Sequence, residues 1–179
     1  MTDLSHAKSI PLKSKVSPEE WAMRVDIAAC YRLVALFVMN DLVYNHISGR
    51  VPGEEGHFLI NPYGYAYEEV TASSLVKIDF DGKLVLDSGT GYGINRAGFV
   101  IHSAIHAARP DAHCIIHTHD TDGVAVACKA GGLAMDNFYA AFLDGHVAYH
   151  DFEGVTTSTG EQPRLVASLG SKRVLILRN

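Results

Sequence analysis

Helical and strand-like stretches alternate along the second half of the chain, and this alternation constrains the fold more than any other feature. Apolar periodicity predicts helices over 97–108, 124–129, 135–143 and 161–169, and strands over 113–119, 146–150 and 174–177. The apolar runs at 114–116 and 174–177 predict buried strands. Such an alternation favours an α/β domain in which helices cover both faces of a sheet.

The first half of the chain carries clear local signals. Ser17 and Pro18 predict a helix start, Glu20 completes a capping box, and the helix should run to about Asn40. Residues 1–16 are polar and aperiodic and predict a flexible N-terminal arm, which leaves 17–179 as one domain. Short strands are expected near 43–48 and 57–60, and a hairpin at 75–79 and 84–87 around Asp81 and Gly82.

Composition excludes several classes of protein. The 179 residues carry a net charge of −5 and no basic stripe, so a nucleic acid or an anionic membrane is not expected as a partner. No apolar stretch is long enough to span a membrane, and the N-terminus does not resemble a signal peptide. Three cysteines without a Cys-x-x-Cys pair indicate reduced thiols and a cytoplasmic protein.

The sharpest chemical signal is the sequence His117-Thr118-His119, which follows the apolar run at 114–116. Residues two apart on a strand point to the same face, so both imidazoles can reach one divalent ion. Two imidazoles suit zinc, iron, nickel or cobalt better than magnesium or calcium. The His-x-His motif alone is weak, because two polar histidines at a strand end give the same pattern.

Five segments occurring in a fixed order give this motif a context. Together they resemble the class II aldolase/adducin family, with features of its adducin-like branch at 93–99 and 147–154, and the resemblance covers residues 21–179. The segments are NHISGR (45–50), NPYG (61–64), AGFVIHSAIHAARPDA (97–112), CIIHTHD (114–120) and VLILRN (174–179).

The resemblance implies a three-layer α/β/α sandwich with a central, mainly antiparallel sheet, and a homotetramer with sites near subunit interfaces. It implies that His117 and His119 are metal ligands, with zinc as the expected ion and iron, cobalt, manganese or nickel as alternatives. A third histidine ligand would come from a His-Gly that follows a final strand similar to VLILRN. Since that histidine would come directly after Asn179, the domain is expected to be truncated at its C-terminus.

The resemblance also reveals a departure from the family pattern. The family's catalytic acid falls at Gly98, and the two serines before it are replaced by Arg96 and Ala97. The catalytic residue is therefore unknown, and the weak candidates are Tyr92, His102 and Asp120. Candidate substrate-binding residues are His46, Arg50, Tyr63, Gly64 and Asn95.

Most of these residues also have an ordinary structural explanation. His102 could be a satisfied helix histidine, His46 a loop histidine without a role, and Arg50 part of a surface salt bridge. His146 or His150 could replace the third ligand, although histidines in a core or on a surface are commoner.

Three functions remain open at this point. The first is a metal-dependent lyase that cleaves a C–C bond of a small hydroxy-carbonyl or carboxylate compound. The second is a non-enzymatic, adducin-like protein-interaction domain, which the glycine at Gly98 favours. The third is a non-haem iron oxygenase or decarboxylase of the same fold, since such proteins also lack the aldolase acid.

Overall fold

The computed structural model describes residues 11–178. The predicted arm lies mostly outside these residues, and Leu12–Lys15 within it form a short 3₁₀ helix. Further 3₁₀ turns occupy Tyr67–Glu69 and Thr159–Glu161. The helices are α1 (Pro18–Leu36), α2 (Arg96–Ala108), α3 (Thr121–Ala127), α4 (Phe138–Ala141) and α5 (Gln162–Leu169), and the strands are β1 (His46–Arg50), β2 (His57–Ile60), β3 (Val76–Asp79), β4 (Leu84–Leu86), β5 (Cys114–His117), β6 (Val147–His150) and β7 (Val174–Leu177).

Helix α1 begins as predicted and ends earlier than predicted. The Ser17 side chain accepts a hydrogen bond from the Glu20 backbone N–H at 3.0 Å, and a proline occupies the first turn. The helix stops at Leu36 because Val38 takes the left-handed conformation with φ 55°, which closes the helix end.

The Glu20 side chain does not complete a capping box. Its two carboxylate oxygens instead accept hydrogen bonds from Arg24 Nε at 2.9 Å and from Lys77 Nζ at 2.8 Å. Glu20 and Arg24 are fully buried, and the Lys77 side chain is 9% exposed. This ionic cluster joins α1 to β3 beneath the protein surface.

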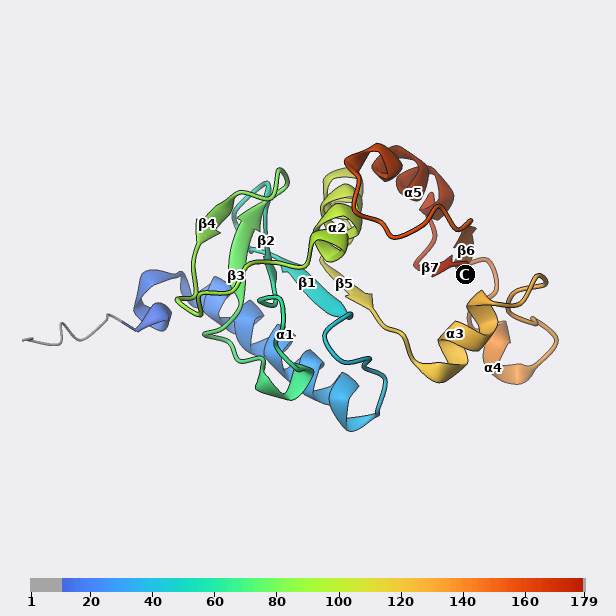
Figure 1. Ribbon diagram of the computed structural model, residues 1–179, viewed down its shortest axis with the longest axis horizontal. Coiled ribbons are helices and arrows are strands. Elements are labelled where there is room, and N and C mark those ends of the chain that lie inside the picture. The colour runs from blue at the N-terminus through green and yellow to red at the C-terminus, as the bar shows by residue number, and fades with distance from the viewer. Residues whose placement is uncertain (1–10, 179) are drawn as a thin grey trace, which may run out of the picture.

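The central sheet has five antiparallel strands in the order β4-β3-β2-β1-β5. Helix α1 covers one face of it and α2 the other, with α5 packed beside α2 (Figure 1). Alternate residues of β2 divide between the two cores: Leu59 packs with the α1 core, whereas Phe58 and Ile60 pack with Phe99 of α2. The predicted α/β class with a central, mainly antiparallel sheet is therefore confirmed.

The C-terminal strands differ from the prediction in burial. Strands β6 and β7 form a separate parallel pair, and β1 is the one strand among the described residues that pairs with β5 (Figure 1). Both runs predicted to be buried are partly exposed: Cys114 and Ile116 of β5 are exposed, and β7 is of intermediate burial. The reason is that each strand lacks a partner on one side within the described residues.

The remaining elements follow the predicted order with shifted boundaries. Helix α3 starts earlier than expected because Asp120 caps it, accepting from Gly123 N–H at 2.9 Å. The expected helix at 135–143 is reduced to α4 at Phe138–Ala141. Among the described residues, no helix combines the length and the apolar character needed to cross a membrane.

Candidate metal centre

His117 and His119 converge at the end of β5. Their Nε2 atoms lie 2.8 Å apart and their ring planes are inclined at 85°. Only His117 belongs to the strand, because β5 ends there and His119 lies in the loop before α3. The convergence thus arises from the turn after the strand rather than from the strand alternation that the sequence suggested.

Asp41 holds the outer side of His119. Its Oδ2 accepts a hydrogen bond from His119 Nδ1 at 3.1 Å, which leaves Nε2 of a neutral ring with a free lone pair. The loop that carries Asp41 contains Val38 and Leu42, whose φ angles are 55° and 45°. Residues with side chains rarely take such angles, so this loop stores strain where it positions the carboxylate.

The electrostatics of the pair favour the neutral form of His117. Burial, and secondarily the proximity of His119, lowers the pKa of His117 to about 4. At neutral pH the ring is therefore unprotonated on one nitrogen, which is the state that a metal ligand requires.

A cavity of about 1010 Å³ opens over the histidine pair. Its lining residues come from the end of β5 and from the segment between β6 and β7, among others. The structure brings together at this cavity the two predicted metal ligands and four of the other candidates. Those four residues are His46, Tyr63, Asn95 and Asp120.

The other candidates lie elsewhere. The Arg50 guanidinium contacts the backbone carbonyls of His106, Arg109 and Ala112 at the end of α2, apart from the cavity. Gly64 is a turn residue with φ 92°. Tyr92 is 57% exposed and packs edge-on against Tyr65.

Gly98 lies in the first turn of α2, directly against the ring of His46. A Cβ at position 98 would lie 2.6 Å from His46 Cδ2 and 2.7 Å from its Cγ, closer than real Cβ contacts allow. The space where a side chain of residue 98 would begin is thus occupied by an imidazole.

His102 takes part in a buried network that the sequence analysis missed. His46 Nδ1 contacts His102 Nε2 at 2.9 Å, and Ser48 Oγ contacts His102 Nδ1 at 2.6 Å and His106 Nε2 at 2.8 Å. His106 Nδ1 donates to the Ala112 carbonyl at 3.0 Å. The spacing of His102 and His106, four residues apart on one helix, was the available signal.

Two further sequence candidates are placed by their contacts. The ring nitrogens of His150 contact Ser168 Oγ at 2.9 Å and Glu161 Oε1 at 3.2 Å, so neither is free for an ion. His146 lines a second cavity, on the side of β5 and β7 toward α2. Within residues 11–178, no three histidine, cysteine or acidic side chains are grouped as a complete metal site.

The comparisons with known proteins now define the class of protein. The family described as "Class II Aldolase and Adducin N-terminal domain" matches residues 25–179. Because the match covers most of the chain, the protein belongs to the class II aldolase and adducin family. The family resemblance inferred from the five sequence segments is thereby confirmed.

Both branches of the family are represented among the relatives. A Caulobacter vibrioides relative named as an aldolase class 2 protein is 51% identical over 171 residues, covering 96% of this chain and 66% of the relative. Alpha-adducin of Rattus norvegicus is 49% identical over 161 residues, covering 89% of this chain and 22% of the adducin. The chain thus spans about two thirds of the length of the bacterial relative.

Solved structures give the same result. An aldolase II superfamily protein from Pseudomonas syringae superposes with a TM-score of 0.92 at 51% identity, covering 95% of this chain and 68% of the other. An L-fuculose 1-phosphate aldolase from Glaciozyma antarctica gives a TM-score of 0.79 at 31% identity, covering 90% of this chain and 62% of the other.

Proposed function

We propose that this protein is a metal-dependent lyase that cleaves a C–C bond of a small hydroxy-carbonyl or carboxylate compound. His117 and His119 would hold the ion, with zinc as the expected metal. Similarity to an L-fuculose 1-phosphate aldolase supports this reaction class, since that relative is 31% identical. The assembly would be a homo-oligomer, by analogy with the tetramers expected for the family.

The observation that carries the proposal is the convergence of two imidazole nitrogens on one point. Two zinc ligands at 2.0–2.1 Å in tetrahedral geometry lie roughly 3.3 Å apart. The Nε2 atoms of His117 and His119 are 2.8 Å apart. The two rings would therefore have to move apart by only about half an ångström to admit an ion between these atoms. Asp41 supplies the carboxylate that metal-bound histidines usually carry on their second nitrogen.

The protein's own groups would position and desolvate the substrate. A bound divalent ion would act as a Lewis acid on a carbonyl oxygen. His46, Tyr63 and Asn95 line the same cavity and can contact a substrate held there. The Asp120 carboxylate also faces the cavity, but it caps α3 through Gly123, which limits its freedom to move a proton.

Metal analysis tests the proposal directly. After dialysis against buffer with equimolar zinc, iron and cobalt, the protein should hold an ion that elemental analysis detects. His117→Ala should lose that ion, whereas His113→Ala, an exposed histidine four residues earlier, should retain it. Equal metal content in all three proteins would remove the site. Retention of iron alone, with oxygen consumption, would favour the oxygenase alternative over the lyase.

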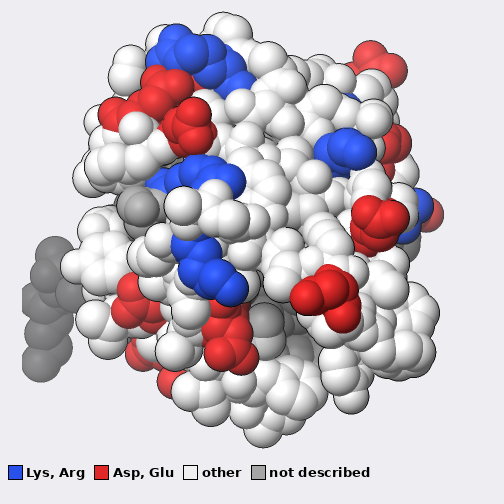
Figure 2. Space-filling view, turned by 90° about the vertical axis from the view of Figure 1, so that its right-hand side faces the viewer, with Lys and Arg blue, Asp and Glu red and all other residues white. Residues whose placement is uncertain are grey.

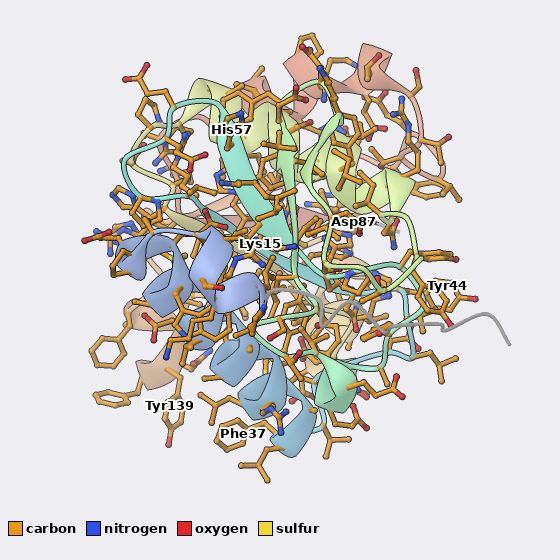
Figure 3. All side chains as sticks on the ribbon, turned by 90° about the vertical axis from the view of Figure 1, so that its left-hand side faces the viewer. Lys15, Phe37, Tyr44, His57, Asp87 and Tyr139 are labelled. Carbon is orange, nitrogen blue, oxygen red and sulfur yellow. The ribbon has the colours of Figure 1, made fainter. Side chains whose placement is uncertain are left out.

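A non-enzymatic interaction domain is the second candidate. Its support is the 49% identity to alpha-adducin and a set of exposed apolar side chains. Phe37 after α1 and Tyr139 on α4 both project outward (Figure 3), and they are 67% and 82% exposed. Phe138 and Phe142 add to the α4 surface with exposures of 73% and 71%. Exposed apolar surface of this kind typically marks a protein contact.

On the face formed by the C-terminal half, basic and acidic side chains are interspersed around uncharged regions (Figure 2). Light scattering of the wild type and of the double variant Phe138→Ser/Phe142→Ser tests whether this apolar surface mediates contacts between copies of the chain. A wild-type oligomer that dissociates in the variant indicates contacts between copies, and a monomer in both excludes such contacts through this surface.

A further inference from the structure

Three buried imidazoles and one serine form a continuous chain of hydrogen bonds between β1 and α2. It runs from the Ala112 carbonyl through His106, Ser48 and His102 to His46. His46, Ser48, His102 and His106 are each at most 1% exposed. Because burial disfavours a charged ring without an acidic partner, we treat the three imidazoles as neutral.

The contact between His106 and the Ala112 carbonyl fixes the first proton of the chain. The Ala112 carbonyl can only accept, so the 3.0 Å contact requires that His106 Nδ1 carries the hydrogen. A neutral His106 then presents a lone pair at Nε2. Ser48 Oγ, 2.8 Å from that atom, must donate its single proton to it.

The remaining protons follow in order. Since the Ser48 proton is used, Ser48 Oγ accepts from His102 Nδ1–H at 2.6 Å. His102 Nε2 is then a lone pair and accepts from His46 Nδ1–H at 2.9 Å. Each ring is held in the Nδ1–H form, and the last atom of the chain, His46 Nε2, is left with a free lone pair.

His46 Nε2 lies where a ligand could use it. Among residues 11–178 it has no hydrogen-bond partner, although the ring lines the cavity over His117 and His119. Gly98 leaves room for the ring, because any side chain there would meet it. An unpaired acceptor at the wall of a cavity is unusual unless water or a ligand satisfies it.

We propose that His46 Nε2 is a hydrogen-bond acceptor for a hydroxyl group of the substrate, in a tautomer set by His102, Ser48 and His106. The last three are positioning residues. This inference deepens the proposed lyase function, because it identifies the group recognised here as a hydroxyl donor. An ionised phosphate or carboxylate oxygen would be repelled at this point, because it has no hydrogen to donate and its lone pair would face that of His46 Nε2.

The ring geometry argues against a third metal ligand at this position. The rings of His46 and His117 are stacked, with centroids 4.6 Å apart and planes inclined by only 15°. A nitrogen lone pair lies in the plane of its ring, so two stacked rings direct their lone pairs side by side. They therefore do not aim at one ion as the rings of His117 and His119 do.

The tautomers can be measured directly in the wild-type protein. Long-range ¹H–¹⁵N spectra of histidine-labelled protein distinguish a bare nitrogen from a protonated one. We expect the Nδ1–H form for His46, His102 and His106 at neutral pH, with His46 Nε2 bare. Finding His46 in the Nε2–H form, or doubly protonated, would overturn the proposal.

Ser48 provides the matched pair of variants. Ser48→Ala frees His102 Nδ1 from its acceptor, so His102 can turn to the Nε2–H form and shift His46 to the same form. Ser48→Thr keeps the hydroxyl and should keep the wild-type tautomers. An unchanged His46 in folded Ser48→Ala would show that the chain does not set its tautomer. If a variant fails to fold, the wild-type spectra still decide the tautomer itself.

A pair of small ketones tests the recognition. Hydroxyacetone should move the His46 Nε2 resonance of the wild type, whereas acetone and acetate, which have no hydroxyl donor at neutral pH, should not. In Ser48→Ala the affinity for hydroxyacetone should fall about fivefold to tenfold, the value of one hydrogen bond. Equal responses to acetone and hydroxyacetone would contradict the proposal. Because these spectra need no metal, loss of the zinc site would leave them unchanged and would count against the lyase function alone.

Discussion

The ring of His46 occupies the space beside Gly98, so that a Cβ at position 98 would lie 2.6 Å from His46 Cδ2. The contact joins the first turn of α2 to the first residue of β1. Glycine at position 98, where the family resemblance implies an acid, leaves this space to the imidazole. In this chain an imidazole on the neighbouring strand fills the volume that a side chain at position 98 would need.

Gly98→Ala should therefore destabilise the protein although alanine favours helix. The helical preference contributes about 1 kcal/mol in favour of alanine. Overpacking against a ring held in a hydrogen-bonded network costs roughly 1–3 kcal/mol. We expect a net loss of up to about 2 kcal/mol in urea unfolding. Gly131→Ala is the control, because a Cβ there meets nothing within 4 Å. Equal stability of the wild type and Gly98→Ala would mean that His46 can move aside freely.

Asp41→Asn should weaken metal binding without unfolding the protein. The asparagine can still accept from His119 Nδ1 through its carbonyl oxygen, but it no longer carries the charge that raises the basicity of the ring. Replacing such a carboxylate typically costs about 10–100-fold in metal affinity, and we expect the lower end. Competition with a chromogenic zinc chelator would measure the zinc affinity of the variant and of the wild type.

The exposed Asp144 supplies the control for that measurement. Asp144→Asn changes the net charge by the same amount at a position that does not line the cavity. Its zinc affinity should match that of the wild type. A similar loss in both variants would assign the effect to overall charge rather than to the contact with His119.

Local signals predicted much of the fold. Strands β2 and β7 have the bounds expected from the sequence, and the start of α1 follows from Ser17 and Pro18. In each case the determining residues are neighbours in the chain, so capping and apolar periodicity suffice. The hairpin of β3 and β4 around Gly82 follows from turn chemistry in the same way.

Features that depend on distant residues were beyond the sequence. The pairing of Glu20 with Lys77 joins residues 57 positions apart, and Ser48 and His106 are 58 positions apart. No periodicity encodes such contacts. The position of Asp41 against His119 depends on the unusual φ angles of Val38 and Leu42, residue types for which no sequence rule predicts a left-handed backbone.

The buried ionic cluster predicts a large stability effect from a small change. Glu20→Gln keeps the size of the side chain but leaves Arg24 and Lys77 without their buried carboxylate. Breaking a buried pair in this way typically costs about 3–5 kcal/mol. Because Glu54 also contacts Lys77, we expect about 3 kcal/mol in chemical unfolding.

The preceding residue gives a matched control for this change. Glu19 is exposed in the same helical turn, so Glu19→Gln should alter stability by no more than about 0.5 kcal/mol. If both substitutions had the same small effect, the cluster would contribute no more than a surface ion pair.

Stability should fall in mild acid, and His106 should account for part of the fall. Burial, with Arg50 as the second cause, lowers the pKa of His106 from 6.5 to about 4. Between these pH values the unfolded chain binds the proton and the folded protein does not, so protons favour unfolding. The contribution of His106 to the free energy of unfolding is constant above pH 6.5 and declines as the pH falls to 4. The total loss, reached below pH 4, amounts to roughly 3 kcal/mol.

Removing the ring should remove this part of the pH dependence. His106→Gln is expected to be less stable than the wild type at pH 7, and the difference should narrow as the pH falls, because only the wild type loses the contribution of a buried neutral imidazole. Denaturant unfolding at several pH values measures it, with exposed His113→Gln as the control that should parallel the wild type. Parallel curves for His106→Gln would contradict the assignment, since the acid sensitivity would then belong to other groups.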